Sequence, residues 1–262
     1  MKSLKFDDRV YFKSDILEKS NKIVHFFTTK PGGFSEGKIN GLNLGFRVGD
    51  KFESVRRNYI QIAEDFHIPF NKITAAKQIH STDIRVISEK DFGMGVSRTE
   101  EIFEADGLIT NCKNVPIMVF YADCVPILMH DEVSGVIGAI HSGWRGTALK
   151  IAEKAVLLMK DRFGTKPENI KAVIGPSIGN CCFETDKEVA KNFDIQFVEP
   201  LPNNKFMVDL WSANQKILLD AGLNPEKIDV FKICTKCNCD LLYSYRAHGE
   251  KTGRMGAVIM LT

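Results

Sequence analysis

The chain has 262 residues, of which 44% are hydrophobic and 26% charged, and this composition excludes a disordered protein and provides for a sizeable core. Its 35 Lys and Arg residues nearly balance 33 Asp and Glu residues, and a formal net charge of +2 does not favour binding to nucleic acid or to a membrane surface. The first residues lack the apolar core of a signal peptide, and the longest nearly apolar stretch, 115–129, is interrupted by Asp123 and is too short to span a bilayer. We therefore expect a cytoplasmic protein that binds neither membrane nor nucleic acid.

In the first half of the chain, short strands accompany one amphipathic helix. A strand is predicted over Ile23–Thr28 and ends before a Pro-Gly-Gly turn. A helix is predicted over Glu53–Phe66, because its apolar residues recur on one face. Arg85–Ser88 and Gly107–Thr110 are predicted as short strands.

Three closely spaced apolar runs follow at Ile117–Tyr121, Val125–Met129 and Gly135–Ile140. Runs of about five or six apolar residues are typical of strands that are covered on both faces. Each run is followed by polar or reactive side chains, which we expect at the open ends of the strands. Thr147–Phe163 is then predicted as a helix with one apolar face and with Thr147 as its N-cap.

The C-terminal third contains short strands and two further helices. A strand at Ala172–Ile174 precedes a capping box at Thr185–Glu188, which predicts a helix that extends to about Phe193. Another helix is predicted over Val208–Ala221 and ends at Gly222. The remaining predicted strands are Val230–Cys234, Leu241–Tyr245 and Met255–Leu261. Clustered strands interspersed with helices indicate an α+β or mixed α/β fold built in layers.

The seven cysteines are an odd number in a chain without a predicted export signal. In a reducing cytoplasm they are expected to be thiols or metal ligands, and not a disulfide framework. No internal repeat, low-complexity segment or linker rich in Pro, Gly and Ser divides the chain. We therefore predict one domain over residues 1–262.

Three residues form a candidate set of metal ligands. Cys124 lies between two predicted buried strands, and His141 follows the third. Together with His80 they would supply two imidazole nitrogens and one thiolate and leave a fourth tetrahedral position open, as in catalytic zinc sites. The spacing of the three is no short ligand motif, so a partly buried thiol with two ordinary histidines is the alternative.

A glycine-rich loop, His141–Gly146, connects a predicted strand to a predicted helix. Its two glycines allow a tight turn, N–H groups at a helix start attract anions, and Arg145 presents donors that match phosphate or carboxylate. We predict an anion site at this loop, against the alternative of a turn with a solvated arginine. Asn43 and Arg57 are weaker candidates for contacts to a ligand, with a turn and an exposed helix charge as their alternative reading.

Cys234, Cys237 and Cys239 superficially resemble a zinc knuckle. Structural zinc requires four ligands, usually from two paired clusters. The other cysteine cluster consists of adjacent residues, Cys181 and Cys182, and adjacent cysteines rarely chelate one ion together. We therefore expect free thiols at these five positions.

A series of motifs resembles the laccase-domain family, once called multicopper polyphenol oxidoreductases and also known as YfiH. In the order of the family they are Gly41–Gly45 with Val48–Asp50, Gln78–Ser81, Ala105–Gly107, Ala122–Ile127, His141–Gly146, Gly175–Ile178 with Cys181–Glu184, and Ser244–Arg246 with Thr252–Met255. The resemblance extends from about residue 40 to the C-terminus. One departure is Arg246–Gly249, where the family usually has a second Arg and an Asp.

The resemblance implies a single-domain layered sandwich with mixed β-sheets covered by helices, and it implies that His80, Cys124 and His141 are the catalytic metal ligands. It also implies purine nucleoside chemistry, namely phosphorolysis of adenosine, inosine, guanosine and methylthioadenosine, and deamination of adenosine. Purine nucleosides and phosphate would then be the partners. The residues that we predict to bind substrate are Asn43, Arg57, Gln78 and Arg145. Of these, Arg145 would also take part in catalysis by holding phosphate beside the sugar.

The expected metal is Zn²⁺, which would activate water for attack on C6 of adenine. Cu²⁺ is also expected to bind, because copper outcompetes zinc on such ligands, but the six histidines are too few for a four-copper oxidase. Three alternatives stay open. One is a cysteine hydrolase or transferase that edits peptidoglycan precursors, with Cys124 as nucleophile and His141 as its base. The others are a copper-dependent polyphenol oxidase and a metal-binding protein without catalysis.

Overall fold

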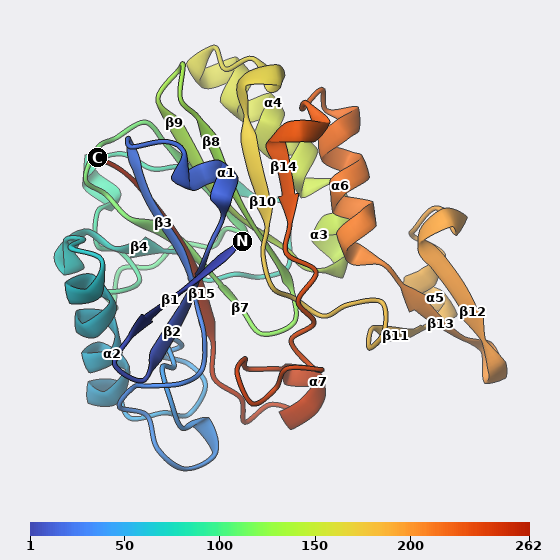
Figure 1. Ribbon diagram of the computed structural model, residues 1–262, viewed down its shortest axis with the longest axis horizontal. Helices are drawn as coiled ribbons and strands as arrows, with labels where there is room; N and C mark the ends of the chain where they lie inside the picture. The colour runs from blue at the N-terminus through green and yellow to red at the C-terminus, as the bar shows by residue number, and fades with distance from the viewer.

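Two six-stranded β-sheets lie face to face in the computed structural model, which describes residues 1–262 (Figure 1). The first sheet, in spatial order, contains β1 (Lys2–Phe6), β2 (Arg9–Lys13), β3 (Ile23–Thr28), β15 (Met255–Leu261), β7 (Ile117–Tyr121) and β4 (Thr74–Ala75). The second, in spatial order, contains β14 (Ile228–Val230), β10 (Lys171–Ile174), β8 (Val125–Asp131), β9 (Val136–Ser142), β6 (Gly107–Thr110) and β5 (Ile84–Val86). Most neighbours are antiparallel, but β4–β7, β5–β6 and β10–β14 are parallel, so both sheets are mixed.

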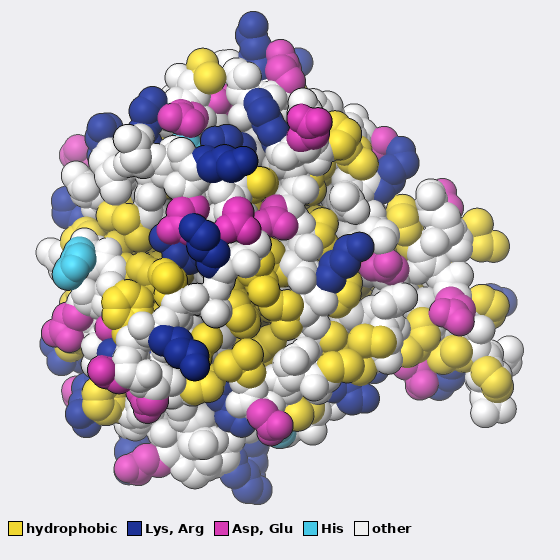
Figure 2. Space-filling view, viewed as in Figure 1, with side chains coloured by type: hydrophobic (Ala, Val, Ile, Leu, Met, Phe, Trp, Pro, Cys, Tyr) yellow, Lys and Arg dark blue, Asp and Glu magenta, His cyan; other side chains and the backbone are white.

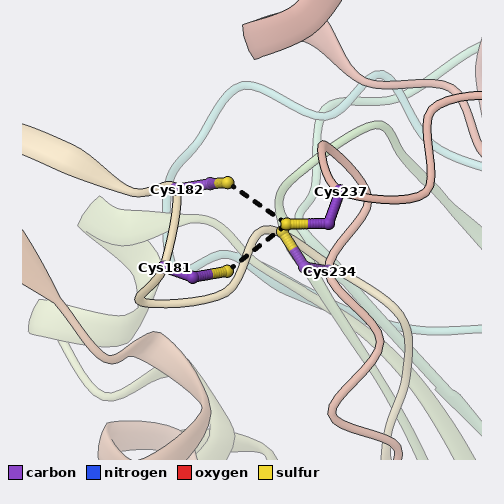
Figure 3. Close-up of side chains that lie close together, drawn as sticks. All are labelled: Cys181, Cys182, Cys234 and Cys237. Carbon is purple, nitrogen blue, oxygen red and sulfur yellow. Dashed lines mark hydrogen bonds between the residues drawn. The ribbon is translucent and has the colours of Figure 1, made fainter.

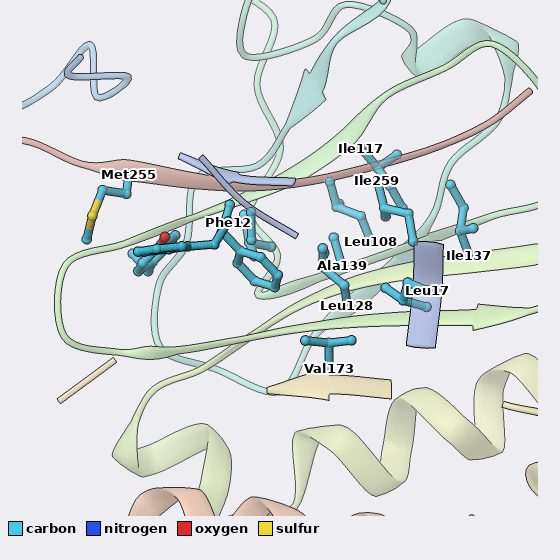
Figure 4. Packing of buried hydrophobic residues seen from close by; sticks show 14 of the residues in the cluster. Phe12, Leu17, Leu108, Ile117, Leu128, Ile137, Ala139, Val173, Met255 and Ile259 are labelled. Carbon is cyan, nitrogen blue, oxygen red and sulfur yellow. The ribbon is translucent and has the colours of Figure 1, made fainter. Parts of the chain in front are cut away.

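The main hydrophobic core lies between the two sheets (Figure 4). Ile117 of β7 and Ile259 of β15 belong to the same buried cluster as Leu128 of β8 and Ala139 of β9. Every residue of β8, β9 and β15 is buried, because these strands are covered on both faces. Strands in this position become nearly continuous apolar runs, which is the pattern that the sequence shows.

Helices cover the outer face of each sheet and complete a four-layered sandwich (Figure 1). The helix α2 (Phe52–Asp65) packs Val55, Tyr59 and Ile62 against the first sheet. The second sheet is covered by α3 (Trp144–Ala148), α4 (Ile151–Phe163) and α6 (Leu210–Asp220). The predicted mixed α/β fold, with layered mixed sheets covered by helices, is thus confirmed.

A third sheet stands out from one side of the molecule (Figure 1). It contains, in spatial order, β11 (Glu184–Asp186), β13 (Lys205–Val208) and β12 (Val198–Leu201). The short helices α1 (Asp15–Glu18), α5 (Lys187–Ala190) and α7 (Tyr245–His248) complete the structure. None of the helices combines the length and the apolar character that crossing a membrane requires. On the face shown in Figure 2, Lys and Arg side chains are interspersed with Asp and Glu.

Two of the predicted helices are wrong in extent. The helix predicted from Thr147 is divided, because Lys150 adopts a left-handed φ of 58° between α3 and α4. Thr147 lies inside α3, where its hydroxyl accepts a hydrogen bond from Asn214 at 3.0 Å. The capping box is also wrong, because Thr185 belongs to β11 and the short helix α5 already ends at Ala190.

The last predicted elements are shifted or replaced. Val208 ends β13, and α6 begins only after Asp209, whose carboxylate accepts a backbone N–H of the first helical turn. The strand predicted over 230–234 is displaced towards the N-terminus as β14. Residues 241–244 form no strand, Tyr245 already begins α7, and the Tyr243 hydroxyl donates to the Ile39 carbonyl at 3.0 Å. The apolar character of Leu242 and Tyr243 reflects burial and not pairing in a sheet.

Candidate functional site

His80, Cys124 and His141 come together at the end of the sandwich where the chain crosses between the sheets. β7 belongs to the first sheet and β8 to the second, so residues 122–124 connect the two. His141 lies near the end of β9, in register with Pro126 of β8. His80 comes from the loop between β4 and β5 and has a left-handed φ of 60°.

The geometry of these three side chains fits a single metal ion. Their ligand atoms lie within 4.8 Å of one another, and the Cys124 Sγ is 3.8 Å from the His80 Nε2. The two imidazole rings are 5.0 Å apart and nearly perpendicular, at 84°. A tetrahedral zinc ion lies about 2.0–2.1 Å from nitrogen and about 2.3 Å from sulfur, which separates two such ligands by about 3.6 Å. Small side-chain movements are therefore enough to place all three around one ion.

Gly143 leaves the space that these ligands need. A Cβ atom at this position would lie 3.1 Å from the His80 Cδ2 and 3.2 Å from the Cys124 Sγ. It would also lie 3.6 Å from the His141 Cε1. The backbone of Gly143 thus forms one wall of the ligand cluster, and a side chain there would press on two of the three ligands.

Asp106 organises the site, although the sequence reading assigned it no role. Its fully buried carboxylate accepts hydrogen bonds from the His141 Nδ1 at 2.8 Å and from the backbone N–H groups of His80 and Ser81 at 3.0 and 2.7 Å. Burial raises the pKa of Asp106, but the hydrogen bonds from His141 and Ser81 outweigh it and lower the pKa below its usual value. A carboxylate that holds Nδ1 of a histidine leaves Nε2 free for a metal ion.

Cys124 and His141 shift each other's pKa in opposite directions. Burial raises the pKa of the Cys124 thiol, but the charge of His141 and hydrogen bonds from His141 and His80 outweigh it and lower the pKa to about 6. Burial lowers the pKa of His141, but the Cys124 thiolate and the Asp106 carboxylate outweigh it and raise the pKa to about 9. At neutral pH the sulfur is therefore already in the thiolate form that binds metals.

A pocket of about 870 Å³ opens onto the three ligands. This volume lies within the range of about 300–1,000 Å³ that is usual for small-molecule sites. Its walls combine aromatic and apolar side chains with arginines, and they include Phe46, Phe120, Ile178 and Phe183. The pocket thus offers apolar surface to a flat ring and positive charge to an anion.

The predicted substrate-binding residues differ in their placement. Gln78 lines the pocket, and its amide is fixed on Phe120, donating to the carbonyl at 2.9 Å and accepting from the N–H at 2.6 Å. Asn43 is fully buried, and its side-chain oxygen accepts the backbone N–H groups of Gly45 and Arg254 at 2.9 and 2.8 Å. Asn43 therefore builds the turn that carries the pocket wall and does not line the pocket itself.

The two predicted arginines lie outside the lining of the pocket. Arg57 is exposed, with its guanidinium 3.7 Å from the centre of the Phe34 ring. Arg145 is also exposed and lies 4.3 Å from the ring of Trp144, which does line the pocket. Both side chains stack on an aromatic neighbour, a stable arrangement for a guanidinium.

Other arginines, which the sequence reading did not single out as ligand-binding, line the pocket. Arg254 is partly buried, and its Nη1 donates to the carbonyls of Thr252 and Gly253 at 2.9 and 3.1 Å. Its Nε and Nη2 make no hydrogen bond within the protein. Arg246 also lines the pocket, but both of its terminal nitrogens donate to backbone carbonyls. The Thr-Gly-Arg-Met motif contained Arg254, but only the fold shows where its side chain points.

Four of the other five cysteines form a second cluster of potential metal ligands. The Sγ atoms of Cys181, Cys182, Cys234 and Cys237 lie within 4.8 Å of one another (Figure 3). The sequence alone favours no shared metal ion for the adjacent pair Cys181–Cys182 and the pair Cys234–Cys237. Cys239, the fifth of these cysteines, lies outside the cluster.

Comparisons with known proteins show the family and the fold. The family model described as multi-copper polyphenol oxidoreductase laccase matches residues 24–262. The chain is 34% identical to "Purine nucleoside phosphorylase YlmD" of Bacillus subtilis, over 92% of this chain and 90% of the relative. It is 31% identical to "Adenosine deaminase RL5" of an unknown prokaryotic organism, over 92% of this chain and 95% of the relative. The crystal structure of YlmD from Geobacillus stearothermophilus is similar, with a TM-score of 0.92 and 32% identity, and the match covers 98% of this chain and 97% of the other.

Proposed function

The chain belongs to the multi-copper polyphenol oxidoreductase laccase family, and from this membership we propose that it is a metal-dependent purine nucleoside enzyme. It would phosphorolyse adenosine, inosine, guanosine and methylthioadenosine and would deaminate adenosine. The observation that carries the proposal is a cluster of three potential metal ligands beside a pocket of about 870 Å³ with aromatic and arginine side chains. Relatives named purine nucleoside phosphorylase and adenosine deaminase support it.

In this proposal His80, Cys124 and His141 hold Zn²⁺. Bound zinc supplies Lewis acidity at one end of the pocket. Asp106 keeps the proton on the His141 Nδ1 and so directs Nε2 to the ion, while Cys124 provides the thiolate. Cu²⁺ would also bind the same three ligands, because the Irving–Williams order favours copper over zinc.

The purine base would lie against the aromatic walls, and phosphate would be held by an arginine. Arg254 is the first candidate, because two of its donor nitrogens are free and it is partly buried in the pocket wall, whereas Arg47, which also lines the pocket, is exposed. Arg145, at the loop where the sequence predicts an anion site, is the competing candidate. Arg254→Gln should raise the apparent KM for phosphate about tenfold or more, in line with the loss of a charge-assisted hydrogen bond. Arg145→Ala tests the competing site in the same assay, and unchanged phosphate dependence in Arg254→Gln would exclude the assignment to Arg254.

The decisive experiment measures metal content and nucleoside turnover on the same preparations. The purified protein is incubated with adenosine or inosine, with and without phosphate, and chromatography separates free base from deaminated nucleoside. His80→Ala and Cys124→Ser should lose zinc and turnover together, because each removes one of only three protein ligands. Cys239→Ser, outside both ligand clusters, is the matched control and should retain both.

A second function is favoured by one observation. The Asp106 carboxylate is hydrogen-bonded to the His141 imidazole, and this imidazole lies beside the sulfur of Cys124. Cysteine-nucleophile enzymes use the same arrangement of acid, base and nucleophile. Such an enzyme would be a hydrolase or transferase, for example in the editing of peptidoglycan precursors. A Cys124→Ser protein that keeps its zinc but is inactive, together with an active His80→Ala protein, would establish this function instead.

We further propose that residues 1–262 act as one domain in the cytoplasm. The family model matches nearly the whole chain, and both large sheets contribute to one buried cluster. A single cooperative transition in urea unfolding, seen alike by fluorescence and circular dichroism, is expected of one domain. Two separated transitions would argue for two.

A further inference from the structure

Four cysteines from two distant segments meet beside the pocket (Figure 3). Cys181 and Cys182 lie in the loop between β10 and β11, and Cys234 and Cys237 lie in the loop between β14 and α7. The Cys237 Sγ is 3.6 Å from the Cys181 Sγ and 3.5 Å from the Cys182 Sγ. All four sulfur atoms lie within 4.8 Å of one another.

These separations match a tetrathiolate metal site. Zinc lies about 2.3 Å from each thiolate, so the sulfurs at the corners of its tetrahedron are about 3.8 Å apart. A disulfide requires about 2.05 Å between its two sulfurs and leaves the other two cysteines without a partner. We propose that Cys181, Cys182, Cys234 and Cys237 bind a structural Zn²⁺ ion, at a second metal site separate from His80, Cys124 and His141.

The fold explains why an adjacent pair and a Cys-x-x-Cys pair can share one ion. β10 and β14 are parallel neighbours, with Ile174 opposite Val230, so the chain leaves both strands in the same direction. The two loops then stay joined by backbone hydrogen bonds from the Ser177 N–H to the Ile233 carbonyl at 3.1 Å and from the Thr235 N–H to the Ser177 carbonyl at 3.0 Å. Cys234 lies between the two bonded residues Ile233 and Thr235, and the other three cysteines follow this connection within a few residues.

The proposed ion would fix two loops that form the pocket wall. One loop contributes Ile178 and Phe183 to the pocket, and the other leads to Tyr245 and Arg246. The guanidinium of Arg246 already bridges the loops, because it donates to the carbonyl of Cys182 at 3.0 Å. Closed tetrathiolate zinc sites are structural, so the role that follows is to hold this wall in place.

The same segment is also tied to the metal ligand Cys124 through its neighbour Asp123. The Thr235 hydroxyl donates to one carboxylate oxygen of Asp123 at 2.5 Å, and the Arg246 N–H donates to the other at 2.6 Å. Asp123 is buried and has a left-handed φ of 95°. The two sites are therefore connected mechanically but have no ligand in common.

The test counts metal ions in protein purified under reducing conditions without added metal. Elemental analysis should find two zinc ions per chain in the parent protein and one in Cys237→Ser. The control Cys239→Ser should keep two, and His80→Ala should lose only the ion of the other site. Loading with Co²⁺ should give the visible spectrum of a tetrathiolate centre in His80→Ala and not in Cys237→Ser. Equal zinc content in Cys237→Ser and Cys239→Ser would overturn the proposal.

Alkylation of the unaltered protein provides a test that does not depend on the folding of a variant. Cys181 and Cys237 are exposed, so as free thiols they would react rapidly with iodoacetamide. As zinc ligands they should be protected at least tenfold until a strong chelator is added, as read by peptide mass spectrometry. Rapid alkylation of both in the native protein, or a mass lower by two hydrogens that shows a disulfide, would refute the zinc site. Because His80→Ala reports on the other site, failure here is distinguishable from failure of the proposed function.

Discussion

Replacing Asp106 by Asn probes how the metal ligands are held. One carboxylate oxygen accepts from the His80 N–H and the His141 Nδ1, and the other accepts from the N–H groups of Ile79 and Ser81. An Asn side chain has one carbonyl oxygen and one NH₂ group. When the amide oxygen holds the His80 N–H and the His141 Nδ1, its NH₂ group faces the Ile79 and Ser81 N–H donors, which then have no acceptor. The reverse orientation would force the His141 proton from Nδ1 to Nε2.

The loss of folding stability in Asp106→Asn follows from these unsatisfied donors. A buried donor left without a partner costs about 1–3 kcal/mol, so two of them should destabilise the fold by about 2–6 kcal/mol. Loss of the carboxylate that orients a ligating histidine typically weakens metal binding about 10–100-fold. We therefore expect Asp106→Asn to be both less stable and weaker in zinc affinity, with nucleoside turnover reduced at limiting zinc.

Asp131→Asn separates the two effects. Asp131 is also fully buried, at the end of β8, and its carboxylate accepts from the Val133 N–H at 2.9 Å and the Ser134 hydroxyl at 2.6 Å. Urea unfolding and competition with a chromophoric chelator give the stability and the zinc affinity of both variants. Asp131→Asn should lose stability alone. If Asp106→Asn binds zinc within twofold of the parent protein, the orienting role of Asp106 is wrong.

Two further predictions concern protons. Since the pKa values of Cys124 and His141 are about 6 and 9, zinc binding at this site at pH 7.5 should release about one proton, from His141. Calorimetry in two buffers with Cys237→Ser, which should keep only this site, measures it, and zero release would contradict joint binding of zinc by the Cys124 thiolate and the neutral His141 ring. Burial lowers the pKa of His130 to about 4, and neither of its ring nitrogens has a hydrogen-bond partner. Between pH 6.5 and pH 4 this histidine is therefore protonated in the unfolded chain but neutral in the folded protein. Stability should therefore fall by about 1.4 kcal/mol per pH unit from this group as the pH drops from 6.5 to 4, and His130→Leu should remove that part of the slope in urea unfolding.

Strands that are buried on both faces could be predicted, because they form nearly continuous apolar runs in the sequence. The predicted bounds at Ile23–Thr28, Gly107–Thr110, Ile117–Tyr121 and Met255–Leu261 are those of β3, β6, β7 and β15. Such strands lie inside the sandwich, where most positions are apolar. The edge strand β1 is mostly exposed and has no continuous apolar run, so it was not predicted.

Contacts between segments that are distant in the sequence could not be predicted from local sequence patterns. The three ligands at 80, 124 and 141 follow from reactive residues near strand ends, combined with the family resemblance. The role of Asp106 depends on β6 lying beside β9, and the meeting of the cysteines depends on β10 lying beside β14. Neither pairing follows from local pattern, because the partners are separated by other elements of the fold. Arg145 was predicted to bind an anion because it lies in a glycine-rich loop. Whether a residue lines the pocket depends, however, on the direction in which its side chain leaves the backbone, and this direction is not visible in the sequence.

The family name points to copper, whereas the names of the relatives state no metal, and the residues help to decide which metal fits. Only His80 and His141 of the six histidines approach Cys124, and the second ligand cluster consists of cysteines alone. A cluster of several copper ions requires more histidines around one point than this fold provides. One copper ion would still bind His80, Cys124 and His141, and by affinity alone it would displace zinc. Copper found after loading in vitro therefore reflects the ligand set and not the reaction, and the metal that matters is the one retained by protein from cells grown without added copper.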